Sequence, residues 1–211
     1  MHTKRSICSA CLRPSTSCIC NLACSISNNT DVLILQHPLE QKNAKGTARL
    51  LQLSLSHCRI VVGETFSPDT LTKLLSEDRL NMLLYPSDAG SIALTLDELK
   101  GISPAPKPLR LIILDGTWRK SRKLLHCNPI LKSLPRLTLD SNLEGQYHIR
   151  KAHKLGQLST LEACCAALSQ LENLDLTPLK TSFDNFIQRL QYQAQQGRAI
   201  SGTIANKTQK P

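Results

Sequence analysis

The sequence predicts an α/β fold in which a mostly parallel β-sheet is covered by helices on both faces. Short, continuous aliphatic segments recur along the chain, and segments with apolar residues at helical spacing separate them. Of the 211 residues, 41% are hydrophobic, which is enough for a globular core. Only 3% are aromatic, so this core must be mainly aliphatic. A small cysteine-rich segment precedes the expected sheet.

Between residues 31 and 100 the sequence predicts three strands that alternate with three helices. Aliphatic segments place the strands at 32–35, 60–62 and 82–85. Helical spacing and helix-start signals place the helices at 43–55, 68–75 and 95–100. Pro68 suits the first turn of a helix, Thr95 suits a helix cap, and Pro86 ends the third strand. Such alternation is typical of a parallel sheet.

The second half of the chain begins with a proline-rich loop and the most continuous aliphatic segment. The expected strands lie at 109–114 and 137–139. The expected helices lie at 117–125, from 159 and from 177. Ser159 and Glu162 have the spacing of a capping box, and Thr177-Pro178 is a helix start. After Gln193 the composition predicts a flexible tail, so the chain divides into a cysteine-rich module at 1–24, an α/β domain at 25–193 and a tail at 194–211.

The chain is strongly basic, with 26 Lys and Arg residues against 16 Asp and Glu residues and a formal net charge of +10. Such an excess attracts polyanions, so nucleic acid is the expected partner. No apolar segment is long enough to cross a bilayer, and the polar N-terminus does not resemble a secretory signal. We therefore expect a cytoplasmic protein that does not bind membranes. Nothing in the sequence points to an obligate protein partner.

Four of the nine cysteines lie close together near the N-terminus, as Cys8-x2-Cys11-x6-Cys18-x-Cys20. Two closely spaced pairs of thiols are typical of a tetrahedral zinc site. Since all four positions would be protein ligands, the ion would stabilise the fold and leave no open position for chemistry. Cys24 is an alternative fourth ligand. The other cysteines are expected to be buried thiols, at Cys58, Cys127, Cys164 and Cys165.

The segment after the longest aliphatic strand is the most specific signal in the chain. In an open parallel sheet, ligands bind beyond the carboxyl ends of the strands, which is where Asp115 is expected. Gly116 permits a tight turn and the close approach of a ligand, Thr117 suits a helix cap, and Trp118 offers a flat face beside the carboxylate. An alternative interpretation makes Asp115 a capping residue and Trp118 part of the core.

Several ordered motifs, taken together, resemble those of the DTW-domain family. The D-x-T-W motif gives this family its name, and the N-terminal C-x2-C-x2-P-x3-C-x-C segment is similar to that of the family. Further matching blocks are Gln36-His37-Pro38-x-Glu40, Tyr85-Pro86-Ser87 and Leu158-Ser159-Thr160-Leu161-Glu162-Ala163. The resemblance runs from residue 8 to residue 163, about three quarters of the chain.

This resemblance implies a SPOUT-like domain with a C-terminal trefoil knot that binds S-adenosylmethionine (SAM). It also implies a tRNA-uridine aminocarboxypropyltransferase, with SAM as co-substrate. Such an enzyme transfers the 3-amino-3-carboxypropyl group to N3 of a tRNA uridine and releases methylthioadenosine. In bacterial members the target uridine lies at position 47 of tRNA. The catalytic domain would be the α/β domain at 25–193, preceded by the zinc module.

Asp115 is the expected centre of the chemistry, together with Thr117 and Trp118. Uridine N3 carries a proton at neutral pH, so Asp115 is either the base that removes it or a clamp for the α-amino group of SAM. The expected SAM-binding residues are Leu84, Tyr85, Pro86, Ser87, Leu114, Gly116, Leu139, Leu158, Ser159 and Thr160. Ser159 and Thr160 lie at a helix N-terminus, where free amides suit the methionine carboxylate, although Ser159 also fits a plain capping box.

Basic residues near these motifs are expected to bind the RNA phosphates. They are Lys42, Arg49, Arg119, Arg122, Lys123, Arg150 and Lys151. His37 is a further hypothesis for catalysis, although an isolated histidine is usually a polar core or surface residue.

Three other functions fit the same sequence. They are a SPOUT-type SAM-dependent RNA methyltransferase, a zinc-containing RNA-binding protein without enzymatic activity, and a related enzyme that modifies rRNA, since charge does not distinguish tRNA from rRNA. The chain lacks a G-x-G-x-x-G motif after a strand, which argues against a Rossmann-type methyltransferase.

Overall fold

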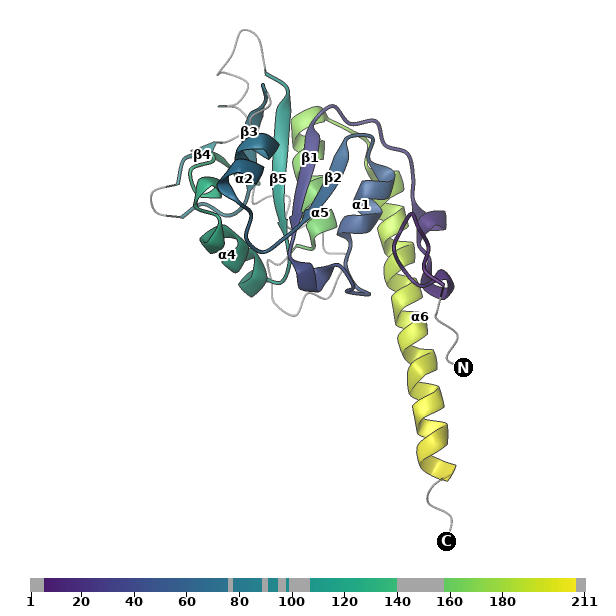
Figure 1. The fold of residues 1–211 in the computed structure, drawn as a ribbon. Helices are drawn as coiled ribbons and strands as arrows, with labels where there is room; N and C mark the ends of the chain where they lie inside the picture. Colours follow the sequence, from purple (N-terminus) through teal and green to yellow (C-terminus); the bar gives the residue numbers. More distant parts are fainter. Residues whose placement is uncertain are drawn as a thin grey trace.

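A computed structural model describes residues 6–75, 78–88, 91–94, 98, 107–139 and 158–207, with side chains described up to residue 196. The described strands form a six-stranded sheet in the order β2-β1-β5-β3-β6-β4, and all their pairings are parallel (Figure 1). The strands are β1 Asp31–Gln36, β2 Cys58–Val62, β3 Leu80–Leu84, β4 Ala93–Leu94, β5 Leu109–Asp115 and β6 Arg136–Leu137. The predicted α/β class and parallel sheet are confirmed.

Helices cover both faces of this sheet (Figure 1). The α-helices are α1 Ala48–Ser54, α2 Pro68–Leu75, α4 Trp118–Cys127, α5 Thr160–Glu172 and α6 Thr177–Lys207. Short 3₁₀ helices are η1 Ser15–Ser17, η2 Cys20–Leu22, η3 Pro38–Glu40 and η4 Pro129–Leu131. One core cluster joins the sheet to α1, α5 and α6, and a second joins it to α2 and α4. Among the described residues, no helix is both long and apolar enough to span a membrane.

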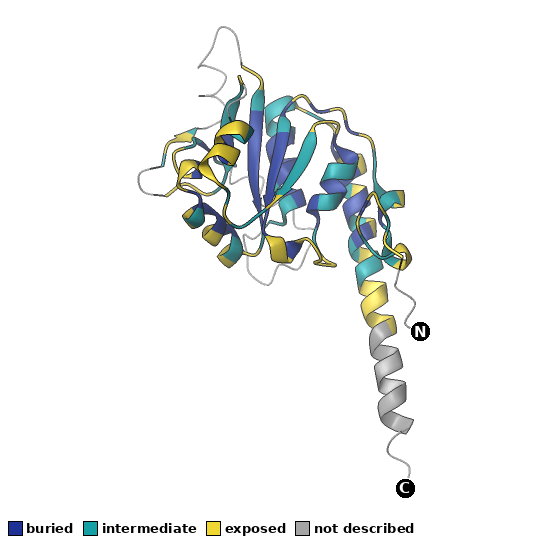
Figure 2. Cartoon of the chain, in the orientation of Figure 1, coloured by how far each residue is buried: buried dark blue, intermediate teal, exposed yellow. Residues whose placement is uncertain are grey.

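The central strands β1 and β5 are buried on both faces, which explains their continuous aliphatic sequences (Figure 2). Alternate residues serve the two core clusters, as Ile34 packs on the α5 side and Leu35 on the α4 side. Because both faces are apolar, the hydrophobic pattern has no period of two. The sheet therefore lies between two mainly aliphatic cores, as the low aromatic content predicts.

Several element boundaries differ from the sequence expectations. Helix α1 begins at Ala48 and not at residue 43, because the chain before it forms a turn in which the amide of Gly46 donates to the carbonyl of Asn43 (3.0 Å). Strand β4 has only two residues, too few for a recognisable pattern. Most of the helix expected at 95–100 lies outside the described residues.

Helix α6 continues to Lys207, where the sequence analysis predicted a flexible tail from residue 194. Its first half packs on the core through Leu179, Phe183 and Phe186. From this packed base the helix can propagate into a Gln- and Ala-containing segment, since both residues favour helix. Its second half extends beyond the body of the molecule (Figure 1).

Candidate active site and metal centre

Asp115 lies at the carboxyl end of β5 and is 5% exposed. Its Oδ2 accepts a hydrogen bond from Nε2 of Gln36 (2.8 Å), and its Oδ1 accepts one from Oγ1 of Thr160 (2.6 Å). Gln36 ends the neighbouring strand β1, in register with Asp115, and Thr160 is the first residue of α5. Three elements therefore meet at this carboxylate and fix its position, where the sequence analysis expected the chemistry.

Burial raises the pKa of the Asp115 carboxyl above its ordinary value. The hydrogen bonds from Thr160 and Gln36 oppose this shift because they stabilise the charged form. Glu40 raises the pKa further and Lys120 lowers it. The net result is a carboxylate that is more basic than one in water, at the expected place for a base.

Gly116 lies in the tight turn between β5 and α4. A β-carbon at this position would lie 2.9 Å from Cβ of Lys120 and 3.7 Å from Cβ of His37. The glycine was expected to admit a ligand, but the observed close approach is to these two protein side chains. The turn is therefore held against the first turn of α4.

Gly116→Ala is expected to destabilise the protein by about 1–3 kcal/mol, as overpacking of a tight contact does. The obstructing atom is a β-carbon and not the end of a flexible side chain, so the backbone has to move. Thermal unfolding of the variant measures this effect. An unchanged melting temperature would show that the turn accommodates a methyl group.

Trp118 is the first residue of α4 and is 51% exposed, so the alternative that it fills the core is wrong. Its ring stacks on that of Tyr85, with 5.3 Å between centroids and 8° between ring planes. Thr117 is the N-cap residue of α4, as predicted, but its side chain makes no capping hydrogen bond. The motif thus presents an exposed indole that is fixed from one side.

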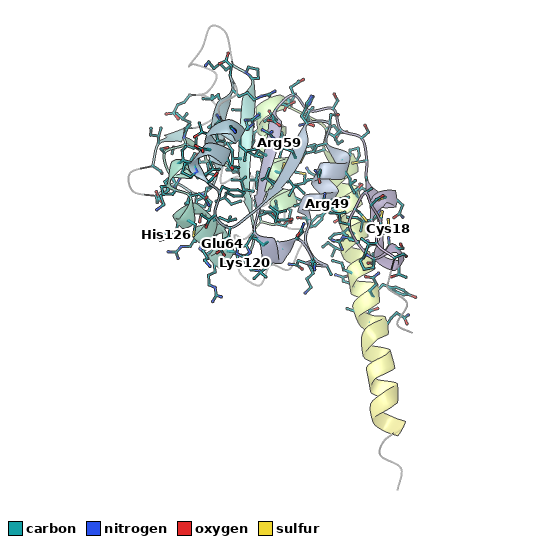
Figure 3. The ribbon with its side chains drawn as sticks, in the orientation of Figure 1. Cys18, Arg49, Arg59, Glu64, Lys120 and His126 are labelled. Atoms are coloured by element: carbon teal, nitrogen blue, oxygen red, sulfur yellow. The ribbon has the colours of Figure 1, made fainter. Side chains whose placement is uncertain are left out.

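An open groove of about 680 Å³ lies beside Trp118. Its lining residues are His37, Leu39, Glu64, Trp118, Arg119, Lys120, Arg122, Lys123 and His126. We call it the basic groove. Three of these residues, Glu64, Lys120 and His126, lie at the α4 end of the molecule in Figure 3. Because most of the charged residues that line the basic groove are Arg or Lys, it is an expected binding site for a polyanion.

Ion pairs organise the wall of the basic groove. Nζ of Lys120 lies 2.6 Å from Oε1 of the buried Glu40, and Nζ of Lys123 lies 2.9 Å from Oε2 of Glu64. Nε2 of His37 lies 2.7 Å from the same oxygen of Glu64, while Nδ1 of His37 accepts from the amide of Leu39. The Nδ1 contact assigns the proton to Nε2, so His37 donates to Glu64.

The predicted RNA-binding residues are only partly brought together. Arg119, Arg122 and Lys123 line the basic groove, whereas Lys42 and Arg49 are not among its lining residues. Arg150 and Lys151 lie outside the described residues.

The predicted SAM-binding residues surround the carboxyl edge of the sheet. Leu84, Leu139 and Leu158 pack against the core cluster on the α5 side. Tyr85 and Leu114 belong to the cluster on the α4 side. Pro86, Ser87 and Gly116 occupy the turns that follow β3 and β5. The residues thus lie on both sides of the sheet.

The start of α5 has the capping box that the sequence predicted. The side chain of Ser159 accepts from the amide of Glu162 (3.3 Å), and Oε2 of Glu162 accepts from the amide of Ser159 (2.7 Å). The amide of Leu161 donates to Oγ1 of Thr47 (3.3 Å). Within the described part of the chain, this leaves the amide of Thr160 as the first-turn donor that a ligand carboxylate could use.

Two polar groups at this site are not predicted by the sequence analysis above. Gln36 appears there only as part of a family motif, although a polar residue at the end of a buried strand is itself an indication of a site at that edge of the sheet. Glu64 follows β2 and carries no local signal that links it to His37 or Lys123.

The four predicted metal-binding cysteines form a compact cluster. The sulfur atoms of Cys8, Cys11, Cys18 and Cys20 all lie within 4.8 Å of one another. Sγ of Cys8 is 3.6 Å from that of Cys20, and Sγ of Cys11 is 3.7 Å from that of Cys18. A tetrahedral zinc site with Zn–S bonds of about 2.3 Å requires sulfur separations of roughly 3.8 Å, so the cluster fits zinc. Cys24 is not part of it.

The thiols in this cluster differ in acidity before any metal binds. Hydrogen bonds from the backbone of Cys11 and Ala10 lower the pKa of the Cys8 thiol to about 6. Hydrogen bonds with Cys18 and Cys8 raise the pKa of Cys20 to about 12. The shifts are opposite because backbone amides stabilise the Cys8 thiolate, whereas the neighbouring sulfurs favour the protonated form of Cys20. A zinc ion would displace those protons and bind all four thiolates.

The cysteine-rich segment, residues 6–24, is joined to the α/β domain by packing and by two arginines. Its Ile19 is part of the main core cluster. The guanidinium of Arg13 donates to the carbonyls of Ala44 (2.8 Å) and Gly46 (2.9 Å) and lies 5.0 Å from the ring centroid of Phe186. From α6, Arg189 donates to the carbonyl of Cys18 (2.7 Å).

Residues 5–191 match the family model described as the DTW domain. The chain is 33% identical over 175 residues to tRNA-uridine aminocarboxypropyltransferase 2 of Macaca fascicularis, covering 80% of this chain and 57% of the relative. It is 31% identical over 175 residues to the Mus musculus protein of the same name, with the same coverage.

The chain is also 28% identical over 198 residues to tRNA-uridine aminocarboxypropyltransferase A of Arabidopsis thaliana, covering 81% of this chain and 74% of the relative. It thus spans little more than half the length of the two mammalian relatives. No solved structure matches the chain. The order of its motifs and the match over nearly its whole length lead to one conclusion: the chain belongs to the DTW domain family.

Proposed function

We propose that this protein is a SAM-dependent tRNA-uridine aminocarboxypropyltransferase. The observation that carries the proposal is Asp115, a buried carboxylate of raised pKa at the end of β5, three residues before the exposed Trp118 that lines the basic groove. The relatives' names support the same activity. We further propose that the acceptor is N3 of a uridine, with tRNA position 47 as the first site to test.

The reaction replaces one bond to sulfur. The N3 lone pair attacks the methylene carbon of the aminocarboxypropyl arm, an N–C bond forms, and the C–S bond breaks. The electron pair of that bond neutralises the sulfonium and leaves methylthioadenosine, while the N3 proton passes to a base. SAM has three carbons open to attack, so the pocket must orient this methylene and not the methyl group towards the uridine.

Asp115 is the proposed base, because burial raises its pKa and three elements fix its position. The alternative role is a clamp for the α-amino group of SAM. Each oxygen of Asp115 accepts one hydrogen bond from a neutral group and retains a lone pair, so both roles are chemically open.

We propose that SAM binds at the carboxyl edge of the sheet within a SPOUT-like domain that ends in a trefoil knot. The parallel sheet and the approach of α5 to Asp115 support the place of the SAM site, and the knot is proposed from membership of the DTW domain family. The proposed SAM contacts are Leu84, Tyr85, Pro86, Ser87, Leu114, Gly116, Leu139, Leu158, Ser159 and Thr160. We also propose that Cys8, Cys11, Cys18 and Cys20 hold a structural Zn²⁺ ion, for which the sulfur separations are suitable.

We propose a cytoplasmic location because none of the nine cysteines is paired in a disulfide. The absence of disulfides is usual for a protein in a reducing compartment.

Neutralising Arg119 and Arg122 is expected to weaken tRNA binding and to reduce its dependence on salt. Each phosphate contact that is lost should lower the slope of log K against log salt by about 0.7–0.9. Filter binding of the Arg119→Gln/Arg122→Gln variant between low and moderate salt measures this slope. A slope equal to that of the unmodified protein would place the RNA on another surface.

The decisive experiment is incubation of the purified protein with SAM and unmodified tRNA, followed by mass analysis of the nucleosides. Aminocarboxypropyluridine together with methylthioadenosine supports the proposal. A methylated nucleoside would identify an RNA methyltransferase. RNA binding without SAM binding or any product would indicate a zinc-containing RNA-binding protein.

A further inference from the structure

Trp118 is held in place by a stack of cationic and aromatic groups. The guanidinium carbon of Arg136 lies 5.4 Å from the ring centroid of Tyr85, and Tyr85 lies nearly parallel to Trp118. Arg136 is itself buried, donates to the carbonyl of Pro86 (2.6 Å) and pairs with Asp88 (3.0 Å). One face of the indole is therefore used by the protein, and its orientation is set before a ligand arrives.

The remaining surface of this indole opens on the basic groove. Trp118 is 51% exposed although it is the largest apolar side chain in the sequence. Leaving such a ring in water costs hydrophobic stabilisation. The exposure is explained if a flat ligand covers the ring in the working complex.

The charge around Trp118 distinguishes between the two flat ligands of the proposed reaction. Glu40 neutralises Lys120 and Glu64 neutralises Lys123, whereas no carboxylate in the described part of the chain pairs with Arg119 or Arg122. The groove therefore carries surplus positive charge. This charge attracts RNA phosphates and repels SAM, whose sulfonium is cationic.

An exposed aromatic ring flanked by arginines is the usual arrangement for binding a single-stranded nucleic acid. Trp118 follows Asp115 by three residues, so the chain alone keeps their α-carbons within about 11 Å of each other. A base stacked on Trp118 would therefore lie at the same carboxyl edge of the sheet as Asp115, whose carboxylate is hydrogen-bonded to Thr160 on the α5 side.

We propose that the outer face of Trp118 is the stacking platform for the target uridine, after this base has turned out of the tRNA stack. Arg119 and Arg122 hold the adjacent phosphates, and SAM lies on the other side of Asp115. This inference rests on the proposed function and assigns the acceptor, and not the donor, to the basic groove.

Trp118 is the only tryptophan in the chain, so its fluorescence reports directly on this platform. A short single-stranded RNA with one central uridine is expected to quench the fluorescence, because a stacked base removes the excited state of the indole. The same RNA with an abasic site at that position should quench much less. SAM alone should leave the signal nearly unchanged. Quenching by SAM and not by RNA would overturn the proposal and assign Trp118 to the adenine of the donor.

Binding by variants provides the second arm of the test. Trp118→Ala should weaken binding of the uridine-containing RNA by roughly 5- to 150-fold, the range of a lost base–aromatic stack, with SAM affinity unchanged. Trp118→Phe should recover part of the loss, which guards against a folding defect. Tyr192→Ala is the matched control, because Tyr192 is 62% exposed on α6 and is not a lining residue of the groove.

RNA affinity of Trp118→Ala equal to that of Tyr192→Ala would refute the platform. The experiments also distinguish failure of the stacking proposal from failure of the proposed reaction. Quenching by RNA without formation of aminocarboxypropyluridine would retain the platform and reject the reaction. Product formation without quenching would retain the reaction and reject the platform.

Discussion

Replacing Asp115 with asparagine is expected to lower turnover by about 10²- to 10⁴-fold, the usual contribution of a general base. The substitution is nearly isosteric, and the amide can keep both contacts. Its oxygen accepts from Gln36, and its NH₂ group donates to the Thr160 hydroxyl, which can reverse its role. Single-turnover kinetics with saturating SAM and tRNA measure the effect. A rate within a few-fold of the unmodified protein would remove Asp115 from the chemistry.

SAM affinity of the same variant separates the two roles of Asp115. If the carboxylate is the base, calorimetry should give an unchanged dissociation constant for SAM. If it is the clamp, SAM binding should weaken together with turnover.

The Thr160→Val variant tests the role of Asp115 as a base in a second way, because loss of the Thr160 hydrogen bond should raise the pKa of Asp115 further. The acidic limb of the rate profile should then move to higher pH, provided that Asp115 is the base.

The raised pKa of Asp115 also has a consequence for stability. Between the ordinary pKa of an aspartate and the raised value, the folded chain binds more protons than the unfolded chain. The free energy of unfolding therefore falls as pH rises through this interval, and the ionised Asp115 is destabilising at neutral pH. Asp115→Asn should be at least as stable as the unmodified protein there, with a flatter dependence on pH. Melting temperatures at several pH values test this.

Loss of one predicted zinc ligand is expected to have the second large effect. Cys11 is 2% exposed and its sulfur belongs to the four-thiol cluster, so Cys11→Ser should remove the metal and loosen residues 6–24. A loss of several kcal/mol lowers the melting temperature of a protein of this size by roughly 10 °C. Cys24→Ser is the matched control, since Cys24 lies outside the cluster.

Metal analysis decides this prediction together with the melting temperatures. The unmodified protein and Cys24→Ser should each contain one equivalent of zinc, and Cys11→Ser should contain far less. Equal metal content in all three proteins would show that the ion, if present, is bound elsewhere.

The sequence predicted those features of the fold and the site that depend on one short segment of the chain. The aliphatic strand that ends at Asp115 was predictable, because a strand buried on both faces must be apolar throughout and parallel strands carry chemistry at their carboxyl ends. The capping box at Ser159 was equally predictable, because its two hydrogen bonds join residues three positions apart.

The contacts that complete the site could not be found in this way. Gln36 meets Asp115 across 79 positions, and Glu64 meets His37 across 27 positions. Both contacts depend on which strands are neighbours in the sheet and on their register. A local sequence pattern predicts neither of these. The pairing of Tyr85 with Trp118 has the same origin, since it joins the turn after β3 to the start of α4.

The position of Arg13 links the cysteine-rich segment to the stability of the α/β domain. Its guanidinium connects the zinc-binding loops to the turn before α1 and to an aromatic ring on α6. A change that removes residues 6–24 would therefore also take away contacts of the turn before α1 and of Phe186. The cysteine-rich segment is thus expected to stabilise the α/β domain as well as to bind a metal.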